Sequence, residues 1–244
     1  MTDPPLALSE EPAVGGAPLG RRLLAEFTGT GLLVTAVVGS GIMAARLSPA
    51  DVGLQLLENS IATALALGVL ILVFGPVSGA HFNPVVSVAD WWLGRRRGTG
   101  IDGGQLGAYA AAQVLGAIAG SILANAMFAL DPVTWSHTRR TAGHLWLGET
   151  VATAGLVLLI FALVRSGRAA AAPAAVGAYI GAAYWFTSST SFANPAVTIG
   201  RAFTDTFAGI APASLPGYLL AQLAGLLVGV GLLVTLYPDP QPDH

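Results

Sequence analysis

Long apolar segments constrain the fold of this chain more than any other feature of its sequence. Of its 244 residues, 54% are hydrophobic and only 10% are charged, and the mean hydropathy is +0.68. A soluble domain carries about 25% charged residues, and a helix needs about 20 apolar residues to cross a bilayer. The segments long enough to do so are 22–45, 56–76, 104–130, 145–165, 173–190 and 215–237. We therefore expect an all-α membrane protein with six transmembrane helices.

The composition also excludes several classes of function. Cysteine is absent, so the chain has no disulfide bond, thiolate metal ligand or cysteine nucleophile. The net charge is −2, and the basic residues, all arginine, form no clustered excess of the kind that binds nucleic acid. The sequence has no nucleophile–base set, metal-ligand spacing or phosphate-binding loop. It thus predicts neither an enzyme nor a protein that binds a metal, a cofactor or nucleic acid.

Two further apolar segments, 83–94 and 194–207, are too short to span a membrane, and each opens with Asn-Pro. Asn favours the N-cap of a helix and Pro its first position, so both segments predict helix starts. A helix of about 10 residues is about 15 Å long, half the hydrocarbon thickness. An isolated Asn-Pro is usually a turn. Two in matching halves instead predict re-entrant half-helices that meet near the midplane and line a watery pore.

The two halves of the sequence repeat each other. EFTGT, FNPVVSV and AQVLGAIAG in the first half match ETVAT, ANPAVTI and AQLAGLLVG in the second. The polar residues paired by these matches are Asn83 with Asn194, Gln113 with Gln222, and Glu26 with Glu149. Because each half carries three full spans, the second half must insert upside down relative to the first. The chain is therefore expected to be an inverted internal repeat.

This repeat divides the chain into five parts. They are a disordered cytoplasmic tail (1–19), the first repeat (20–130), an extracellular connecting loop (131–144), the second repeat (145–237) and a C-terminal tail (238–244). With the N-terminus in the cytoplasm, seven arginines lie on that side and three on the other, so we expect both termini inside. The first residues lack a basic start followed by an apolar core, which predicts no cleavable signal peptide.

SGAHFNPVVS followed by SFANPAVT, in a duplicated six-span chain, closely resembles the aquaporin and aquaglyceroporin family, also called the major intrinsic proteins. The resemblance extends over about residues 20 to 237. It implies a right-handed bundle in the cell membrane, a homotetramer with one pore per subunit, and passive flow of small neutral solutes. The two signature boxes are Asn83-Pro84-Val85 and Asn194-Pro195-Ala196. The first box departs from the family's Asn-Pro-Ala at Val85.

The two boxes predict how such a pore handles a solute. When the N-termini of two half-helices meet, two positive dipole ends are directed at one point. The amides of Asn83 and Asn194 can donate hydrogen bonds to a passing oxygen, while the field opposes cations and protons. Backbone carbonyls of 78–82 and 189–193 supply acceptors, as unwound segments do in the family. His81 either lines the cytoplasmic half of the pore, as its family counterpart does, or is held in loop packing.

Two carboxylates lie in the opening turns of the first and fourth spans, at Glu26 and Glu149. A buried carboxylate is costly unless several donors satisfy it, and re-entrant loops offer unpaired backbone N–H groups. We therefore expect both glutamates to brace these loops rather than to carry protons. Gln113 and Gln222 are expected to serve the same packing role.

The outer mouth departs from the family pattern. Water-selective and glycerol-conducting members have an Arg directly after the second box, where this chain has Val197. Counting from the boxes places the other filter positions at Thr63, Ala182 and Ser191. These small, uncharged residues imply a wide, weakly selective mouth. Together with FGPVSGAH, they resemble the branch associated with bacterial arsenic resistance, which implies passage of water, glycerol-like polyols, arsenite and related metalloid species.

Arg201, one turn beyond Val197, has two interpretations. It can form a structural ion pair, with Asp205 four residues on as the candidate partner, or it can line the pore in place of the missing filter arginine. The alternative function is an ion- or proton-coupled secondary transporter, because such transporters also use inverted repeats and broken helices. An ion channel is a second rival. We find no ionisable residue at the centre of any span, which favours the passive channel.

Overall fold

The computed structural model describes residues 16–95 and 97–238, and these residues form helices and loops without a strand. Six helices are long and apolar enough to cross a membrane. They are α1 (Leu19–Leu47), α2 (Val52–Ser78), α4 (Gly103–Met127), α5 (Gly143–Arg165), α6 (Ala172–Phe186) and α8 (Leu215–Leu236), where the spans of α6 and α8 also include the 3₁₀ turns that precede them, Ala169–Ala171 and Pro212–Ser214. Each overlaps one of the expected segments, so the prediction of an all-α membrane fold with six spans is confirmed.

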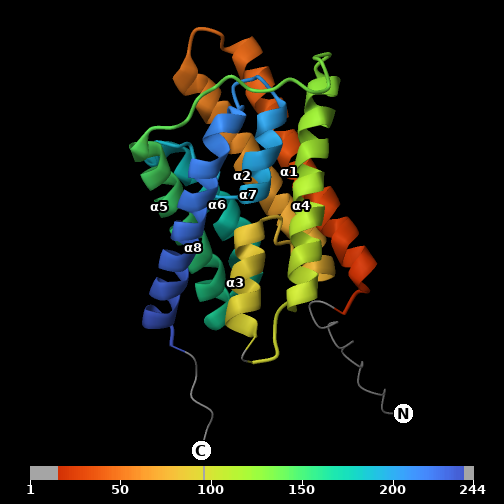
Figure 1. The fold of residues 1–244 in the computed structure, drawn as a ribbon, viewed down its shortest axis with the longest axis vertical. Coiled ribbons are helices and arrows are strands. Elements are labelled where there is room, and N and C mark those ends of the chain that lie inside the picture. Colours follow the sequence, from red (N-terminus) through yellow and green to blue (C-terminus); the bar gives the residue numbers. More distant parts are fainter. Residues whose placement is uncertain (1–15, 96, 239–244) are drawn as a thin grey trace, which may run out of the picture.

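The two ends of the described chain leave the bundle on the same side (Figure 1). This follows from an even number of spans, since each crossing reverses the direction of the chain. The expected tail at 1–19 lies outside the described residues up to residue 15, and α1 already begins at Leu19. The expected tail at 238–244 lies outside them beyond Pro238, as does Arg96 of the arginine-rich loop.

Glycines allow the helices of the first repeat to approach closely. α1 packs against α4 along most of its length. A Cβ atom added at Gly116 would lie 2.2 Å from the carbonyl oxygen of Phe27, and one added at Gly120 would lie 2.2 Å from that of Gly31. Only glycine fits at such a crossing, where small residues let membrane helices pack backbone to backbone.

Glycines also allow close packing in the second repeat, where α5 packs against α8. A Cβ atom added at Gly225 would lie 2.6 Å from the carbonyl oxygen of Thr150, and one at Gly229 would lie 2.6 Å from that of Ala154. The two crossings therefore have the same residue spacing and nearly the same closeness. This correspondence is what an internal repeat requires.

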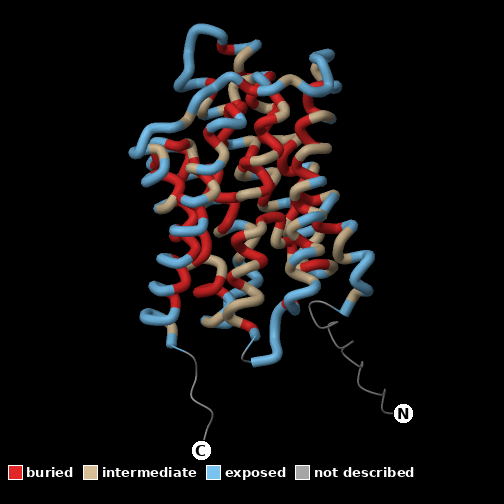
Figure 2. The backbone as a smooth tube through the Cα atoms, in the orientation of Figure 1, coloured by how far each residue is buried: buried red, intermediate tan, exposed pale blue. Residues whose placement is uncertain are grey.

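Two half-helices fill the centre of the bundle, α3 (Pro84–Gly94) and α7 (Pro195–Gly200). Figure 1 shows α3 in the half nearer the chain ends and α7 in the opposite half. Each is capped by its Asn side chain, which accepts a hydrogen bond from the backbone of the first turn. Buried residues follow the interior around these half-helices, and exposed ones cover the outside of the bundle (Figure 2). The expected re-entrant half-helices are present.

The second half-helix is shorter than the sequence predicted. The expected helix covers 194–207, but α7 ends at Gly200, and a 3₁₀ turn follows at Arg201–Phe203. Two carbonyl oxygens of this turn accept hydrogen bonds from the loop between α4 and α5, here called the outer loop after its expected position, through the N–H groups of Thr134 and Ser136. The helix ends here because these carbonyls are paired with the loop instead of with later residues of the same helix.

Candidate functional site

The two signature asparagines meet at the centre of the bundle and hold each other's loops. The Asn83 side-chain amide donates to the carbonyl oxygen of Ala193 at 2.8 Å. Reciprocally, the Asn194 amide donates to the carbonyl oxygen of Phe82 at 2.7 Å. A side-chain amide has two N–H donors, and these contacts use one on each residue. The second donor of each asparagine is therefore available to a solute at this point.

Both re-entrant loops approach the asparagines in an unusual backbone conformation. Ala80 and Phe82 have φ of 50°, and their repeat counterparts Ser191 and Ala193 have φ of 51° and 49°. Such left-handed residues other than glycine cost about 1 kcal/mol or more each and persist only where the surroundings hold them. Their alternation turns successive carbonyl groups to different sides, so that two of them reach the asparagine amides.

Glu26 of α1 holds the first loop from behind. Its Oε1 accepts hydrogen bonds from the Ser78 hydroxyl at 2.6 Å and from the His81 backbone N–H at 3.0 Å. Its Oε2 accepts from the Phe82 backbone N–H and from the Gln113 amide, both at 2.7 Å. The carboxylate is fully buried, and four donors compensate its lost hydration.

Glu149 of α5 holds the second loop in the same way. It accepts hydrogen bonds from the backbone N–H groups of Phe192 at 2.8 Å and Ala193 at 2.9 Å. The Gln222 amide donates to it at 2.6 Å. This carboxylate is also fully buried.

Each glutamine joins its carboxylate to a half-helix. The Gln113 amide also donates to the Ser87 hydroxyl at 3.0 Å, and the Gln222 amide donates to the Thr198 hydroxyl at 2.8 Å. Ser87 and Thr198 both stand four residues after the signature asparagine. A span, a re-entrant loop and a half-helix are thus tied together by one buried network in each repeat.

His81 lies in the first loop and is half-buried. Its Nδ1 is 3.0 Å from the Ser87 hydroxyl, and its ring lies 5.4 Å from the ring of Tyr109, centroid to centroid. These contacts fix the orientation of the imidazole beside the loop. They are compatible both with loop packing and with one edge of the ring facing the pore.

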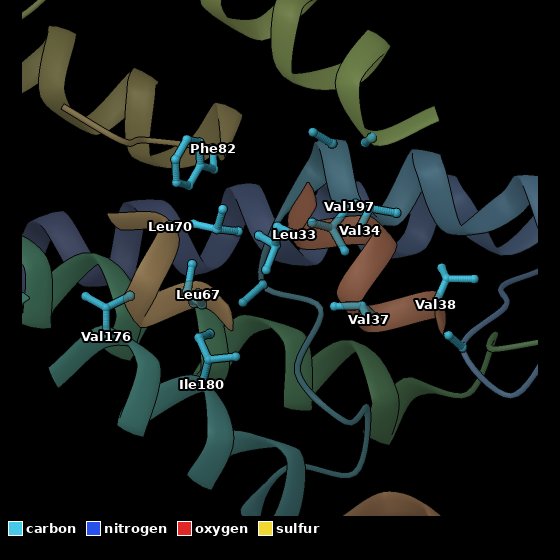
Figure 3. Packing of buried hydrophobic residues seen from close by; sticks show 14 of the residues in the cluster. Leu33, Val34, Val37, Val38, Leu67, Leu70, Phe82, Val176, Ile180 and Val197 are labelled. Carbon is cyan, nitrogen blue, oxygen red and sulfur yellow. The ribbon is translucent and has the colours of Figure 1, made fainter. Parts of the chain in front are cut away.

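Three of the four expected filter positions, Thr63, Ser191 and Val197, are buried. The hydroxyl oxygens of Thr63 on α2 and Tyr184 on α6 lie 3.2 Å apart, and these residues are 2% and 3% exposed. Ser191 is 3% exposed, and its hydroxyl has no hydrogen-bond partner among the described residues. Val197 is 5% exposed and lies next to Val34 of α1 (Figure 3).

Ala182, the fourth expected filter position, is not buried like the other three. The structure places it on the exposed face of α6, whereas Tyr184 contacts Thr63. The position was counted back from the second box through the loop between α6 and α7, where helical spacing does not hold. An error of two residues turns a helix by about 200° and so exchanges its inner and outer faces. The position on α6 that faces Thr63 is therefore taken by the aromatic Tyr184 and not by a small residue.

The expected ion pair between Arg201 and Asp205 is wrong. Asp205 instead accepts a hydrogen bond from the His137 backbone N–H at 2.9 Å and pairs with its ring at 2.9 Å. Arg201 donates through Nε to the Ala208 carbonyl oxygen and stacks on the Phe192 ring, with Cζ 3.4 Å from the centroid. The helix geometry assumed for an i, i+4 pair ends at Gly200, which separates the two side chains.

Comparisons with known proteins identify the family. A family model described as "Major intrinsic protein" matches residues 16–193. The aquaglyceroporin AqpS of Rhizobium meliloti is 51% identical over 226 residues, which cover 92% of this chain and 93% of the relative. This chain belongs to the major intrinsic protein family. A glycerol uptake facilitator protein of Pseudomonas aeruginosa is 32% identical and covers 86% of this chain and 84% of its own.

The fold agrees with that of a solved structure, the X-ray structure of the aquaglyceroporin from Plasmodium falciparum. It aligns with a TM-score of 0.67 and 22% identity, over 90% of this chain and 96% of that one. Major intrinsic proteins are channels, so this chain is a channel protein and not an enzyme. Within residues 16–95 and 97–238, no group of three or more His, Cys, Asp or Glu residues is placed to hold a metal ion.

Three residues near the mouth of this major intrinsic protein were missed in the sequence: Tyr184, Phe192 and Arg140. Tyr184 carries a hydroxyl that needs a partner inside a membrane, and this signal favours an inward position over that of Ala182. Two arginines lie over the Phe192 ring. The Cζ atom of Arg140 is 5.2 Å from the ring centroid, and the Cζ atom of Arg201 is 3.4 Å from it. No sequence signal indicates that stack, because it depends on the path of the loop between α4 and α5 over Phe192.

Proposed function

We propose that this chain is a passive channel for small neutral solutes, namely water and glycerol-like polyols. The observation that carries the proposal is the reciprocal bonding of Asn83 and Asn194 at the N-termini of two half-helices. Each amide keeps one free donor for a passing hydroxyl, while the helix dipoles oppose cations there. Two relatives of this chain are named for glycerol, as an aquaglyceroporin and a glycerol uptake facilitator.

We further propose that Thr63, Tyr184, Ser191 and Val197 form the selectivity filter. The free hydroxyl of Ser191 and the paired hydroxyls of Thr63 and Tyr184 offer hydrogen bonds to a polyol, and Val197 offers an apolar wall. Arsenite, As(OH)₃, is a neutral species with three hydroxyl groups, like glycerol. A filter that accepts glycerol by these contacts therefore also suits arsenite and related metalloid species.

The remaining site residues have supporting roles in this proposal. Glu26 and Glu149, each with its glutamine, brace the re-entrant loops and do not carry protons. Their hydrogen bonds to loop N–H groups support this role, because all the donors point at the charged form. His81 lines the cytoplasmic side of the pore, and the functional halves are 20–130 and 145–237, joined by the loop at 131–144.

The proposed setting is the cell membrane, with both termini in the cytoplasm and four copies in the assembly. Placing the chain ends inside leaves Arg46, Arg139 and Arg140 on the outer side, which accords with the positive-inside rule. Exposed leucines and valines on α2 supply an apolar surface for lipid or for neighbouring subunits. The proposed tetramer rests on the resemblance to the family, which implies a homotetramer.

Proteoliposomes given a hyperosmotic glycerol step test the proposal by stopped-flow light scattering. A channel for both solutes gives fast shrinkage as water leaves, followed by fast reswelling as glycerol enters. Arsenite entry is then measured in the same vesicles, and it should not require an ion gradient. Fast shrinkage without reswelling would indicate a water-selective pore and contradict the proposed filter.

A matched variant isolates the filter in this test. Val197→Arg introduces the side chain that other members carry after the second box, and should lower glycerol entry at least about fivefold with a smaller effect on water. Val164→Ala, at an exposed position on α5, serves as the control and should behave as the wild type. Equal loss of water and glycerol in Val197→Arg would instead point to misfolding or general blockage.

A further inference from the structure

The Arg201 guanidinium lies beside residues of the proposed filter, although its Cα atom follows Val197 by one turn. Arg201 follows Val197 by four residues, and side chains of a helix lean toward its N-terminus. A long side chain can therefore cover the turn of about 5.4 Å that separates them. The guanidinium stacks on Phe192, the residue next to Ser191, and interacts electrostatically with Tyr184.

The charges around Arg201 leave a positive excess. Arg140 lies on the same phenylalanine ring, with its guanidinium donating to the Gly209 carbonyl oxygen at 3.2 Å. The carboxylate of Glu149 attracts the Arg201 charge. Its oxygens already accept the loop and glutamine hydrogen bonds. Asp205, on the same outer segment, is paired with His137.

We propose that Arg201, with Arg140 behind it, is the cation barrier of this channel and replaces the arginine missing at Val197. The inference rests on the proposed function as a neutral-solute channel. A guanidinium that is 2% exposed in a region of low dielectric repels cations and protons strongly, whereas it leaves a neutral polyol unaffected by its charge. The apolar Val197 then sets the width of the mouth while Arg201 sets its charge selectivity.

A purely structural role for Arg201 makes a different prediction, and Arg46 provides the matched control. Arg46 also donates to a backbone carbonyl, that of Phe128 at 2.8 Å, and its Cζ lies 5.0 Å from the Phe128 ring centroid. It makes these contacts at the exposed end of α1, far from the filter residues. Loss of the same kinds of contact at Arg46 should therefore leave ion exclusion unchanged.

The experiment measures cation and proton entry into proteoliposomes under an imposed potential, alongside glycerol reswelling. The variants are Arg201→Gln, Arg201→Lys, Arg140→Gln and Arg46→Gln, with folding judged by size-exclusion profile. Arg201→Gln should raise cation or proton leak about tenfold or more, and Arg140→Gln should raise it about threefold. Arg201→Lys, which keeps the charge, and Arg46→Gln should remain as tight as the wild type.

Two results would overturn the proposal: a folded Arg201→Gln protein with wild-type leak, or an Arg201→Lys protein that leaks as much as Arg201→Gln. If Arg201→Gln does not fold, the ion leak of Arg140→Gln decides the question. A barrier to which both arginines contribute requires that the loss of the Arg140 charge raises this leak. The glycerol trace of the wild type separates this inference from the proposed function. A wild type that admits no glycerol contradicts the function, whereas the ion measurements still judge the barrier.

Discussion

The two re-entrant segments share their contacts near the centre of the bundle and differ at their far ends. Near the centre, each segment has an asparagine that donates to the opposite loop. Each also has a glutamate that receives loop N–H groups and a glutamine that joins this glutamate to the half-helix. Away from the centre, α3 runs for 11 residues, whereas α7 runs for 6 and passes into a turn bonded to the outer loop.

This difference separates what holds the pore from what selects the solute. The shared network fixes strained loop residues, so it must be present in both halves for the asparagines to meet. The far ends carry no such requirement, and there the halves hold opposite charges, Asp90 in α3 and Arg201 after α7. Variation in selectivity is therefore expected at the far ends, whereas changes to the shared network should cost stability.

The largest effect is expected from replacing a bracing carboxylate. Glu26→Gln and Glu149→Gln each place an amide where several buried N–H and O–H donors converge. Because some of these donors then lack an acceptor, each substitution should lower the free energy of unfolding by about 3 kcal/mol or more. For a chain of this size, that corresponds to a fall of roughly 6–12 °C in the midpoint of thermal unfolding in detergent. Glu26→Gln should lose slightly more, because the Ser78 hydroxyl donates to Glu26 at 2.6 Å, whereas the Ser189 hydroxyl that interacts with Glu149 also lies 3.5 Å from the Thr187 hydroxyl. Wild-type stability in either variant would contradict the brace.

The glycine crossings allow a second comparison between the halves. Gly120→Ala forces a Cβ atom to within 2.2 Å of a backbone oxygen, and Gly229→Ala to within 2.6 Å. Overpacking of this kind costs about 1–3 kcal/mol, and we expect the tighter first crossing to lie at the upper end. Thermal midpoints in detergent measure both.

Controls for these variants lie on the same two helices. A Cβ atom added at Gly107 of α4 or Gly231 of α8 meets nothing within 4 Å. Alanine at these positions should leave the midpoint of thermal unfolding unchanged or raise it slightly. The reason is that alanine is more favourable than glycine within a helix by about 1 kcal/mol. Equal losses at crossing and control positions would show that helix flexibility, not close approach, explains the glycines.

Two serines provide a finer test of the glutamate networks. Ser78 donates to Glu26 at 2.6 Å, whereas its counterpart Ser189, although it interacts with Glu149, has its hydroxyl 3.5 Å from that of Thr187. Ser78→Ala should therefore destabilise by about 2 kcal/mol and Ser189→Ala by about 1 kcal/mol. The pair of thermal midpoints measures the difference. Equal losses would mean that the second serine bonds its carboxylate as closely as the first.

Most of the fold could be predicted from the sequence because a bilayer fixes the length of its spans. Apolar length alone identified six helices, and Asn-Pro identified the starts of both half-helices. The end of α7 could not be predicted, since the apolar segment continues to Phe207, while N–H groups of the loop between α4 and α5 bond the carbonyls of the turn after Gly200. Pairing between distant backbone segments leaves no trace in local hydropathy.

The candidate site could be predicted where it follows the repeat and not where it follows loop register. Matching the halves identified Glu26 and Glu149, which the structure places behind the two loops. Counting residues through a loop failed for Ala182, because the rotation of α6 relative to the second box depends on the loop's path. Arg201 was misassigned for a related reason, since its partner ring belongs to a segment whose position the sequence does not specify.

The smallest expected effect concerns the loops that close the two faces. On the side of the bundle nearer the chain ends, Asp90 accepts a hydrogen bond from the Ile101 backbone N–H at 2.8 Å. On the opposite side, the partly exposed Asp205 accepts from the backbone and ring of His137. The His137 backbone N–H, and then its ring, lower the pKa of Asp205. A lowered pKa contributes stability above the unfolded value of about 3.9, and this is lost as the pH falls through the folded value.

Hydrogen exchange of the outer loop, corrected for intrinsic rates, checks this prediction. Protection of residues 134–138 should fall about twofold between pH 5.5 and pH 3, since a solvent-exposed pair is worth no more than about 0.5 kcal/mol. Asp205→Asn removes the charge and should show the lower protection at both pH values. The 11-residue α3, which does not depend on this outer contact, should keep its protection throughout. A parallel loss of protection in α3 would mean that acid loosens the whole bundle, and that the contact between Asp205 and His137 does not act as a separate unit.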